Sequence, residues 1–197
     1  MFQQVAPLTD AISDDVLLAR YAAGDASAAS ELAKRHGGRL IGLAWRLLND
    51  RAEAEDVAQE AMLRLWRVAP QWEAGRAQVS TWLYRVASNL CTDRLRKRRR
   101  ARVGLDDIDD PADPAPSAAE LMQTAARNAA LQEALEALPE RQRQAVVLRH
   151  IEGRANPDIA AMMDISVEAV ESLTARGKRA LAQALAGRRA ELGFEHE

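Results

Sequence analysis

Apolar residues recur every three or four positions through most of this chain, a spacing that predicts helices rather than strands. Ser13, Asp25 and Asp50 each precede such a stripe, where a side-chain oxygen can cap the first turn of a helix. Alanine and leucine are abundant, whereas runs of Val and Ile are scarce, so we predict an all-α fold. The expected helices are 14–23, 26–48, 51–68, 79–102, 121–138, 140–151, 157–163 and 167–186, with a bend at Gly37-Gly38.

Two short helices near the C-terminus have the pattern of a helix-turn-helix motif. Asn156-Pro157-Asp158 combines a capping residue, a proline and a first-turn acid, and predicts the start of the first helix. Asp164 is expected to have a positive φ in the turn, and Ser166 to cap the second helix. The buried Val170 would hold the second helix against the first, which leaves its other face free to enter a DNA groove.

The stretch Val79–Arg102 changes along its length from apolar to strongly basic. Residues 80–103 carry eight Lys/Arg and one acid, Asp93, although the whole chain has a net charge of −2. A helix that buries one face and exposes a ladder of Arg suits a phosphate backbone, and Trp82 and Tyr84 are suited to stacking on unpaired bases. The alternative is a solvated run of charge, favoured at a helix C-terminus by the helix dipole.

Residues 104–120 divide the chain into two parts. They carry six acids, no base and three prolines, with almost no large apolar residue, which is the composition of a flexible, disordered linker. We therefore predict two small helical domains joined by this acidic linker. The expected organisation is a loose N-terminus (1–12), a first domain (13–103), the linker (104–120), a second domain with the helix-turn-helix (121–186) and a C-terminal tail (187–197).

The helix predicted over 51–68 has an outward face of mixed character. Its core stripe is mostly alanine, and the other side carries carboxylates, an amide and large apolar groups. These residues are Asp56, Gln59, Glu60, Leu63 and Trp66. Such a mixture is typical of a docking surface for another protein. An ordinary solvated helix with charge pairs four residues apart fits the pattern equally well.

Three segments in this order resemble the extracytoplasmic-function (ECF) sigma factors of bacterial RNA polymerase. A-E-D-V-A-Q-E-A-M-L-R-L-W (54–66) is similar to the polymerase-binding helix of that family. S-T-W-L-Y-R-V-A-S-N-L-C-T-D-R-L-R-K-R (80–98) resembles its promoter-melting helix. L-P-E-R-Q-R-Q-A-V-V-L-R-H-I-E-G (138–153), followed by the helix-turn-helix, resembles its −35-binding domain. Each motif is weak alone, and the three together are specific.

The resemblance implies an alternative sigma factor that binds core RNA polymerase, directs promoter-specific transcription initiation and is regulated by an anti-sigma factor. It implies that the Gln71–Gln78 loop holds a flipped base. The implied polymerase contacts are Asp56, Gln59, Glu60, Leu63 and Trp66; the −10 contacts are Trp82, Arg85, Asn89, Asp93, Arg96, Lys97 and Arg98; the −35 contacts are Glu171, Ser172, Arg176, Lys178 and Arg179. Glu171 and Leu173 stand where the family often has cations, so the −35 sequence does not follow from the resemblance.

Two other classes of protein compete with this interpretation. A stand-alone helix-turn-helix regulator would account for residues 121–186 but would leave the helices over 51–68 and 79–102 unexplained. A metal-dependent nuclease would need ligands near Asp56, Glu60 or Asp93, and the three histidines are not spaced as ligands. We therefore expect no enzyme activity, no cofactor and no metal.

Cysteine content and hydropathy indicate the compartment. The single cysteine, Cys91, excludes an intramolecular disulfide framework and fits a reducing cytosol, and we expect it to be a packing residue. The sequence shows no signal peptide and no apolar run of about 18 residues or more. We expect a cytoplasmic protein without membrane insertion.

Overall fold

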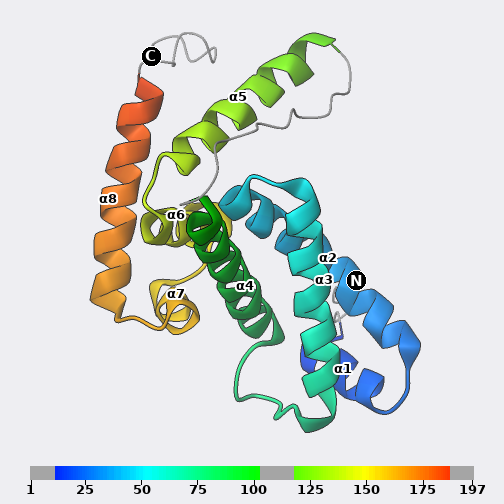
Figure 1. Cartoon of the computed structure of the whole chain (residues 1–197). Helices are drawn as coiled ribbons and strands as arrows, with labels where there is room; N and C mark the ends of the chain where they lie inside the picture. The colour runs from blue at the N-terminus through cyan, green and yellow to red at the C-terminus, as the bar shows by residue number, and fades with distance from the viewer. Residues whose placement is uncertain (1–11, 103–117, 187–197) are drawn as a thin grey trace, which may run out of the picture.

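The computed structural model describes residues 12–102 and 118–186, and every regular element in these two ranges is helical, as predicted (Figure 1). The first domain consists of α1 (Asp14–Ala22), α2 (Ala26–Leu48), α3 (Arg51–Val68), a 3₁₀ turn (Ala69–Gln71) and α4 (Val79–Arg102). The second consists of α5 (Ala118–Glu136), α6 (Glu140–Val146), a π-helical turn (Val147–Ile151), α7 (Asn156–Met163) and α8 (Val167–Ala186).

The predicted N-terminus and C-terminal tail, and most of the predicted linker, fall on residues 1–11, 187–197 and 103–117, outside the described residues. Helix α5 begins at Ala118, inside the segment that we expected to be linker. The sequence signal placed the start of this helix too late because Ala118 and Ala119 are neither apolar anchors nor capping residues.

The first-domain helices begin at the capping residues that the sequence predicted. The Ser13 hydroxyl accepts from the Val16 amide at 3.3 Å. The carboxylates of Asp25 and Asp50 accept from the backbone amides of Ser27 and Glu53, each at 2.9 Å. By contrast, α2 runs without interruption through Gly37-Gly38, where we expected a bend. Its apolar face is buried on both sides of the glycines, and tertiary packing of this kind outweighs their low helix propensity.

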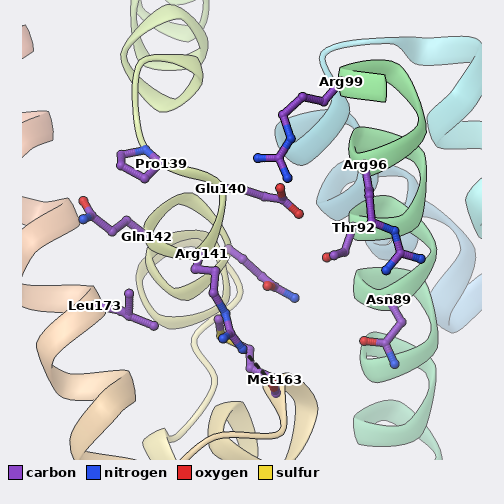
Figure 2. Close-up of a pocket in the computed structure, with 11 residues that line it drawn as sticks. Asn89, Thr92, Arg96, Arg99, Pro139, Glu140, Arg141, Gln142, Met163 and Leu173 are labelled. Atoms are coloured by element: carbon purple, nitrogen blue, oxygen red, sulfur yellow. Dashed lines mark hydrogen bonds between the residues drawn. The ribbon is translucent and has the colours of Figure 1, made fainter. Parts of the chain in front are cut away.

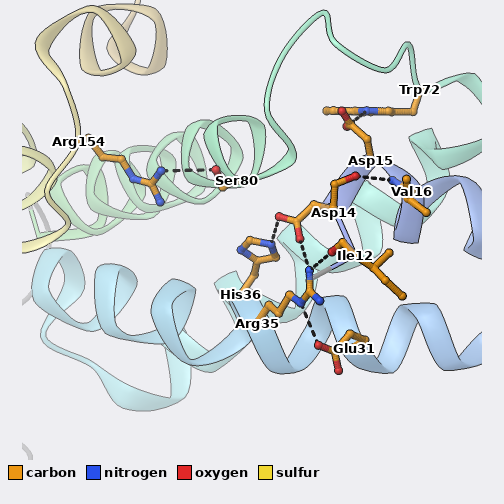
Figure 3. Close-up of polar contacts among 11 residues, drawn as sticks. Ile12, Asp14, Asp15, Val16, Glu31, Arg35, His36, Trp72, Ser80 and Arg154 are labelled. Atoms are coloured by element: carbon orange, nitrogen blue, oxygen red, sulfur yellow. Dashed lines mark hydrogen bonds and ion pairs between the residues drawn. The ribbon is translucent and has the colours of Figure 1, made fainter. Parts of the chain in front are cut away.

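An ion-pair cluster ties the start of α1 to α2 (Figure 3). The buried His36 ring lies 2.7 Å from an Asp14 carboxylate oxygen through Nε2. Arg35 donates to the Ile12 carbonyl at 2.6 Å and to Asp14 at 3.1 Å. His36 therefore has a structural role in the domain, as expected for histidines without ligand spacing.

The second domain has the helix-turn-helix geometry that the sequence predicted. Asp164 has a φ of 53°, the Ser166 hydroxyl accepts from the Ala169 amide at 3.2 Å, and Val170 is fully buried. The Asn156 cap was wrong: α7 is capped at Ala155, and Asn156 is already the first helical residue. Its Oδ1 atom is buried without a partner instead of satisfying the helix start.

Helix α8 crosses α6 at Gly177, a residue to which the sequence pattern assigned no role. Gly177 is buried, and a Cβ atom there would lie 2.5 Å from Val146 Cγ2 and 3.3 Å from the Gln142 carbonyl oxygen. The absence of a side chain therefore permits the close approach that positions the outer face of α8. A single glycine inside a helix of otherwise regular pattern carries no such signal in the sequence.

Gly177→Ala should destabilise the protein even though alanine is the better helix former. Overpacking against a stiff Val146 costs about 1–3 kcal/mol, whereas replacing a mid-helix glycine gains about 0.5–1 kcal/mol. Gly38→Ala in α2 is the matched control, because a Cβ atom there meets nothing within 4 Å and only the gain remains. Urea denaturation measures the free energy of unfolding of both variants. Equal stabilisation by the two changes would contradict the close contact of α8 with α6.

Candidate polymerase and promoter interfaces

The outward face of α3 is present as predicted. Asp56 has a side chain that is 68% exposed, Gln59 is exposed, and Leu63 is 48% exposed despite being large and apolar. Trp66 is half-buried, with its ring 4.7 Å from that of Tyr21, so its position is fixed by α1. The face therefore combines a fixed aromatic, an exposed carboxylate that lies 3.9 Å from Arg94, an amide and an exposed leucine, and such groups are suitable anchors for a partner protein.

Glu60 lies at the edge of this face in a network of surface charges. It accepts from Arg64 at 2.8 Å and lies 3.8 Å from Arg67. The hydrogen bond from Arg64 holds the pKa of the Glu60 carboxyl below its usual value, so Glu60 is negatively charged at neutral pH.

The basic half of α4 contains two kinds of cation. Arg98 donates to the Leu48 carbonyl at 2.9 Å and pairs with Asp50 and Glu53, each at 3.1 Å. Arg94 likewise donates to the Glu53 carbonyl at 2.8 Å. These two cations fasten α4 to the corner between α2 and α3. Lys97, Arg99 and Arg100 are exposed, and among the residues that the structure describes Arg96 pairs with Asp93 of the same helix, at 2.7 Å.

This division changes the expectation for Arg98, whose guanidinium is occupied inside the first domain. We expected Arg98 to contact phosphate because a run of Lys and Arg in a sequence does not show which of its members meet acids from distant helices. The partner Asp50 is 48 residues away.

Lys97→Gln combined with Arg100→Gln should lower the salt dependence of promoter binding by the complex with core polymerase. Each lost phosphate contact reduces the slope of log Kobs against log salt by about 0.9 on duplex DNA and about 0.7 on single strands. Arg98→Gln is the control: it should leave the slope unchanged and cost about 1–2 kcal/mol of stability through its lost hydrogen bonds. An unchanged slope for the double variant would show that these cations do not contact phosphates.

The buried face of α4 contains Leu83, Tyr84, Ala87, Ser88 and Cys91. Burial raises the pKa of the Cys91 thiol to about 12, so this residue is an inert packing group, as predicted. Tyr84 is only 1% exposed, and in this conformation it is not available to stack on DNA bases, contrary to the expectation from sequence. The groups that cover Tyr84 belong to the second domain.

The loop before α4 forms a small aromatic pocket. It has a volume of about 330 Å³ and is lined by Val68, Gln71, Trp72, Glu73, Arg76, Ala77 and Trp82. The Trp72 and Trp82 rings meet edge to face at 6.1 Å, and the Trp72 indole donates to Asp15 at 2.9 Å (Figure 3). The pocket is thus fixed from α1 and α4, and its size and aromatic wall suit a planar base.

The exposed face of α8 presents the residues expected for the −35 element. Glu171, Arg176, Lys178 and Arg179 are exposed, and Ser172 is half-buried. Arg176 donates to the Ser172 hydroxyl at 2.6 Å, one turn earlier on the same helix. Burial, followed by the nearby Lys178 and Arg149, lowers the pKa of His150, which favours a neutral imidazole beside this cationic face.

A groove of about 520 Å³ separates α4 from α6 and α8 (Figure 2). Asn89, Arg96 and Arg99 of α4 line one wall. Arg141 and Leu173 belong to the wall formed by the second domain. Two residues expected to contact the −10 element, Asn89 and Arg96, therefore face the protein's own second domain.

Among the residues that the structure describes, no three His, Cys, Asp or Glu side chains gather as a potential metal site. None of the helices in residues 12–102 and 118–186 combines the length and apolar character needed to cross a membrane.

Comparison with known proteins identifies both domains. The family model for Sigma-70 region 2 matches residues 32–101, and the model for Sigma-70, region 4 matches residues 128–181. The two domains therefore define a sigma-70-type transcription initiation factor. Because region 2 is present, a stand-alone helix-turn-helix regulator does not describe the chain.

Individual relatives show which kind of sigma factor this chain is. The ECF RNA polymerase sigma factor SigM of Mycobacterium tuberculosis is 36% identical over 174 residues, which cover 88% of this chain and 85% of SigM. SigE of Mycolicibacterium smegmatis is 34% identical over 158 residues, which cover 79% of this chain but only 61% of SigE. The solved structure of CnrH in complex with the cytosolic domain of CnrY superposes with a TM-score of 0.65 at 28% identity, over 88% of this chain and 97% of CnrH. The chain belongs to the ECF RNA polymerase sigma factors, as its motifs predicted.

Proposed function

We propose that this ECF sigma factor divides its work among three surfaces: the α3 face binds core RNA polymerase, α4 with its aromatic pocket contacts the −10 region, and α8 contacts the −35 element. The observation that carries the proposal is the exposed Asp56, Gln59 and Leu63 surface, which a DNA-binding regulator would not need. The family match supports core RNA polymerase as the partner for that surface.

At the −10 region, charge and shape support a division between base and phosphate contacts. The pocket beside Trp72 and Trp82 has the size for one flipped base, and Arg85 and Asn89 are exposed on the adjoining turns of α4. Lys97 and Arg100 extend the contact along the backbone. Asp93 pairs with Arg96 and is best placed to orient that cation.

At the −35 element, α8 would enter the major groove, with Glu171, Ser172 and Arg176 toward base edges and Lys178 and Arg179 toward phosphates. The protein supplies recognition and not chemistry, so no enzyme activity is part of the proposal. Transcription initiation with core polymerase would take place in the cytoplasm.

An anti-sigma factor is the proposed regulator. The relative CnrH was solved in complex with the cytosolic domain of CnrY, and the fold that it shares with this chain supports a protein partner for this chain as well.

Titration with purified core polymerase tests the proposal. The full chain should form a stoichiometric complex with core enzyme, and this complex should bind promoter fragments that the free chain does not retain. A chain that binds specific duplex DNA equally well without core polymerase, and does not bind core, would instead be a stand-alone regulator.

A further inference from the structure

The second domain lies directly on α4, and one contact between them covers Tyr84 (Figure 1). The Tyr84 hydroxyl donates a 2.6 Å hydrogen bond to Glu152, which lies between the π-helical turn and α7. The Arg154 guanidinium lies 3.9 Å from the centre of the Tyr84 ring. Arg154 also donates to the Ser80 hydroxyl at 3.5 Å, one turn earlier on α4 (Figure 3). We call Ser80, Tyr84, Glu152 and Arg154 the interdomain latch.

The latch is chemically specific, because Tyr84, which is 1% exposed, meets both an acceptor and a cation from the second domain, while Ser80, Glu152 and Arg154 are half-buried. Burial and the Glu152 hydrogen bond raise the pKa of Tyr84, which keeps the phenol protonated as a donor. The cation of Arg154 lies over the electron-rich face of the same ring. A nonspecific collapse of two domains would not be expected to pair a donor, an acceptor and a cation on one aromatic side chain.

A second contact lies at the other end of the interface, at the C-terminus of α2. Arg143 donates to the Leu47 carbonyl at 2.8 Å, and Gln132 reaches the Trp45 and Arg46 carbonyls, each at 3.4 Å. The Arg46 and Leu47 carbonyls are among those that a helix leaves unpaired at its end, where a cation is also favoured by the dipole, whereas the Trp45 carbonyl also accepts from the Asn49 amide at 2.8 Å. Two separate anchor points therefore fix the orientation of the second domain on the first.

This arrangement cannot bind both promoter elements at once. Elements named for positions 35 and 10 are about 25 base pairs apart, which is nearly two and a half helical turns, or roughly 85 Å at about 34 Å a turn. In the structure, α4 packs against α7, and Asn89 and Arg96 face Arg141 across the groove (Figure 2). The domains must separate before α4 and α8 contact the two elements of one promoter.

We propose that the chain inhibits itself in the free state, with its −35-binding domain held over the promoter-contacting surface of α4 by the interdomain latch. The proposal rests on the function proposed above, because inhibition has meaning only if α4 binds the −10 strand. Binding to DNA then requires opening, and the apparent affinity is reduced by the fraction of molecules that are closed. Core polymerase, which binds the exposed α3 face, would be able to engage the closed chain and stabilise the open one.

Fluorescence energy transfer across the interface tests whether the closed state exists in solution. Dyes are attached to the full chain at Arg51→Cys and Gln183→Cys, both exposed positions on different domains, while the native Cys91 is buried and unreactive. The wild-type latch should give high transfer efficiency. Glu152→Ala and Arg154→Ala, made separately, should each lower it, because both residues lie on the second domain and leave α4 intact. Glu136→Ala, an exposed acid of α5 outside the latch, should not.

Binding to a randomised single-stranded DNA 12-mer then tests inhibition. The two latch variants should bind about tenfold more tightly than wild type, the equivalent of about 1.4 kcal/mol, which is the order expected for one charge-assisted hydrogen bond. Thermal melting checks that each variant is folded, and Gln132→Ala at the second anchor gives an independent route to the open state.

The outcomes separate the two proposals. Low transfer efficiency in the wild-type chain would overturn the closed state, even if that chain directs transcription normally. Latch variants that open without any gain in DNA affinity would overturn self-inhibition. If the wild-type chain shows high transfer efficiency but does not bind core polymerase, the result would instead contradict the function proposed for α3.

Discussion

Replacing Asp56 and Glu60 together with alanine should weaken binding to core polymerase by about 30-fold, the loss expected when hot-spot residues are removed from an interface. The reason is the position of both carboxylates on the outward face of α3, with the exposed Leu63 beside Asp56 in the helical projection. Among the described residues, Glu60 forms surface ion pairs with Arg64 and Arg67, and the exposed Asp56 lies 3.9 Å from Arg94, so removal of the two carboxylates should leave the fold unchanged. Fluorescence titration of labelled protein with core enzyme measures the effect.

The matched control for this variant is Glu31→Ala combined with Glu136→Ala. It also removes two carboxylates, from α2 and α5, so it separates a specific contact from a general loss of negative charge. Wild-type affinity for the Asp56 and Glu60 variant, or an equal loss in the control, would show that the docking surface lies elsewhere on the molecule.

The second large effect is expected in the choice of −35 sequence. Arg176→Ala should flatten the preference at one or two positions, because a bidentate contact from Arg to a base contributes about 1–3 kcal/mol of discrimination. In the free protein Arg176 is exposed and held by the Ser172 hydroxyl, so its guanidinium is already aligned on the outer face of α8. Selection from a randomised −35 library by the complex with core polymerase measures the preference.

Lys178→Ala is the matched control on the same helix. Loss of this exposed cation should weaken binding to all sequences alike, as expected for a phosphate contact. If Glu171 contacts a base, Glu171→Lys should change the selected sequence. If Glu171 only favours the helix start, Glu171→Lys should instead raise the affinity for all sequences. If Arg176→Ala selects the wild-type sequence with undiminished discrimination, the base-contacting face of α8 has been placed wrongly.

Local features of the fold were predictable because their causes lie within a few residues of one another. The caps at Ser13, Asp25, Asp50 and Ser166 and the positive φ of Asp164 all follow from side chains that bond to their own helix start or tolerate a left-handed backbone. The apolar stripes of the helices were predictable in the same way, because they repeat every three or four residues. The outer faces of α3 and α8 could be predicted for that reason, since exposure is the complement of the apolar stripe.

What escaped prediction depends on residues far apart in the chain. The Tyr84 hydrogen bond joins residues 68 positions apart, and no periodicity indicates that an aromatic on a DNA-contacting helix will be buried by another domain. The structural role of Arg98 and the close approach at Gly177 have the same origin, because each depends on a partner helix. The π-helical turn over Val147–Ile151 also has no local signature in the sequence.

Run-off transcription with purified core polymerase tests the central claim most directly. Core enzyme, the full chain and a library of promoter fragments are combined, and the transcripts are sequenced at their 5′ ends. We predict transcripts that begin at defined positions downstream of a common pair of sequence elements, and only when both core enzyme and this protein are present. Transcripts that are independent of this protein, or a protein that binds promoter DNA and never stimulates initiation, would contradict its assignment as a promoter-specific sigma factor.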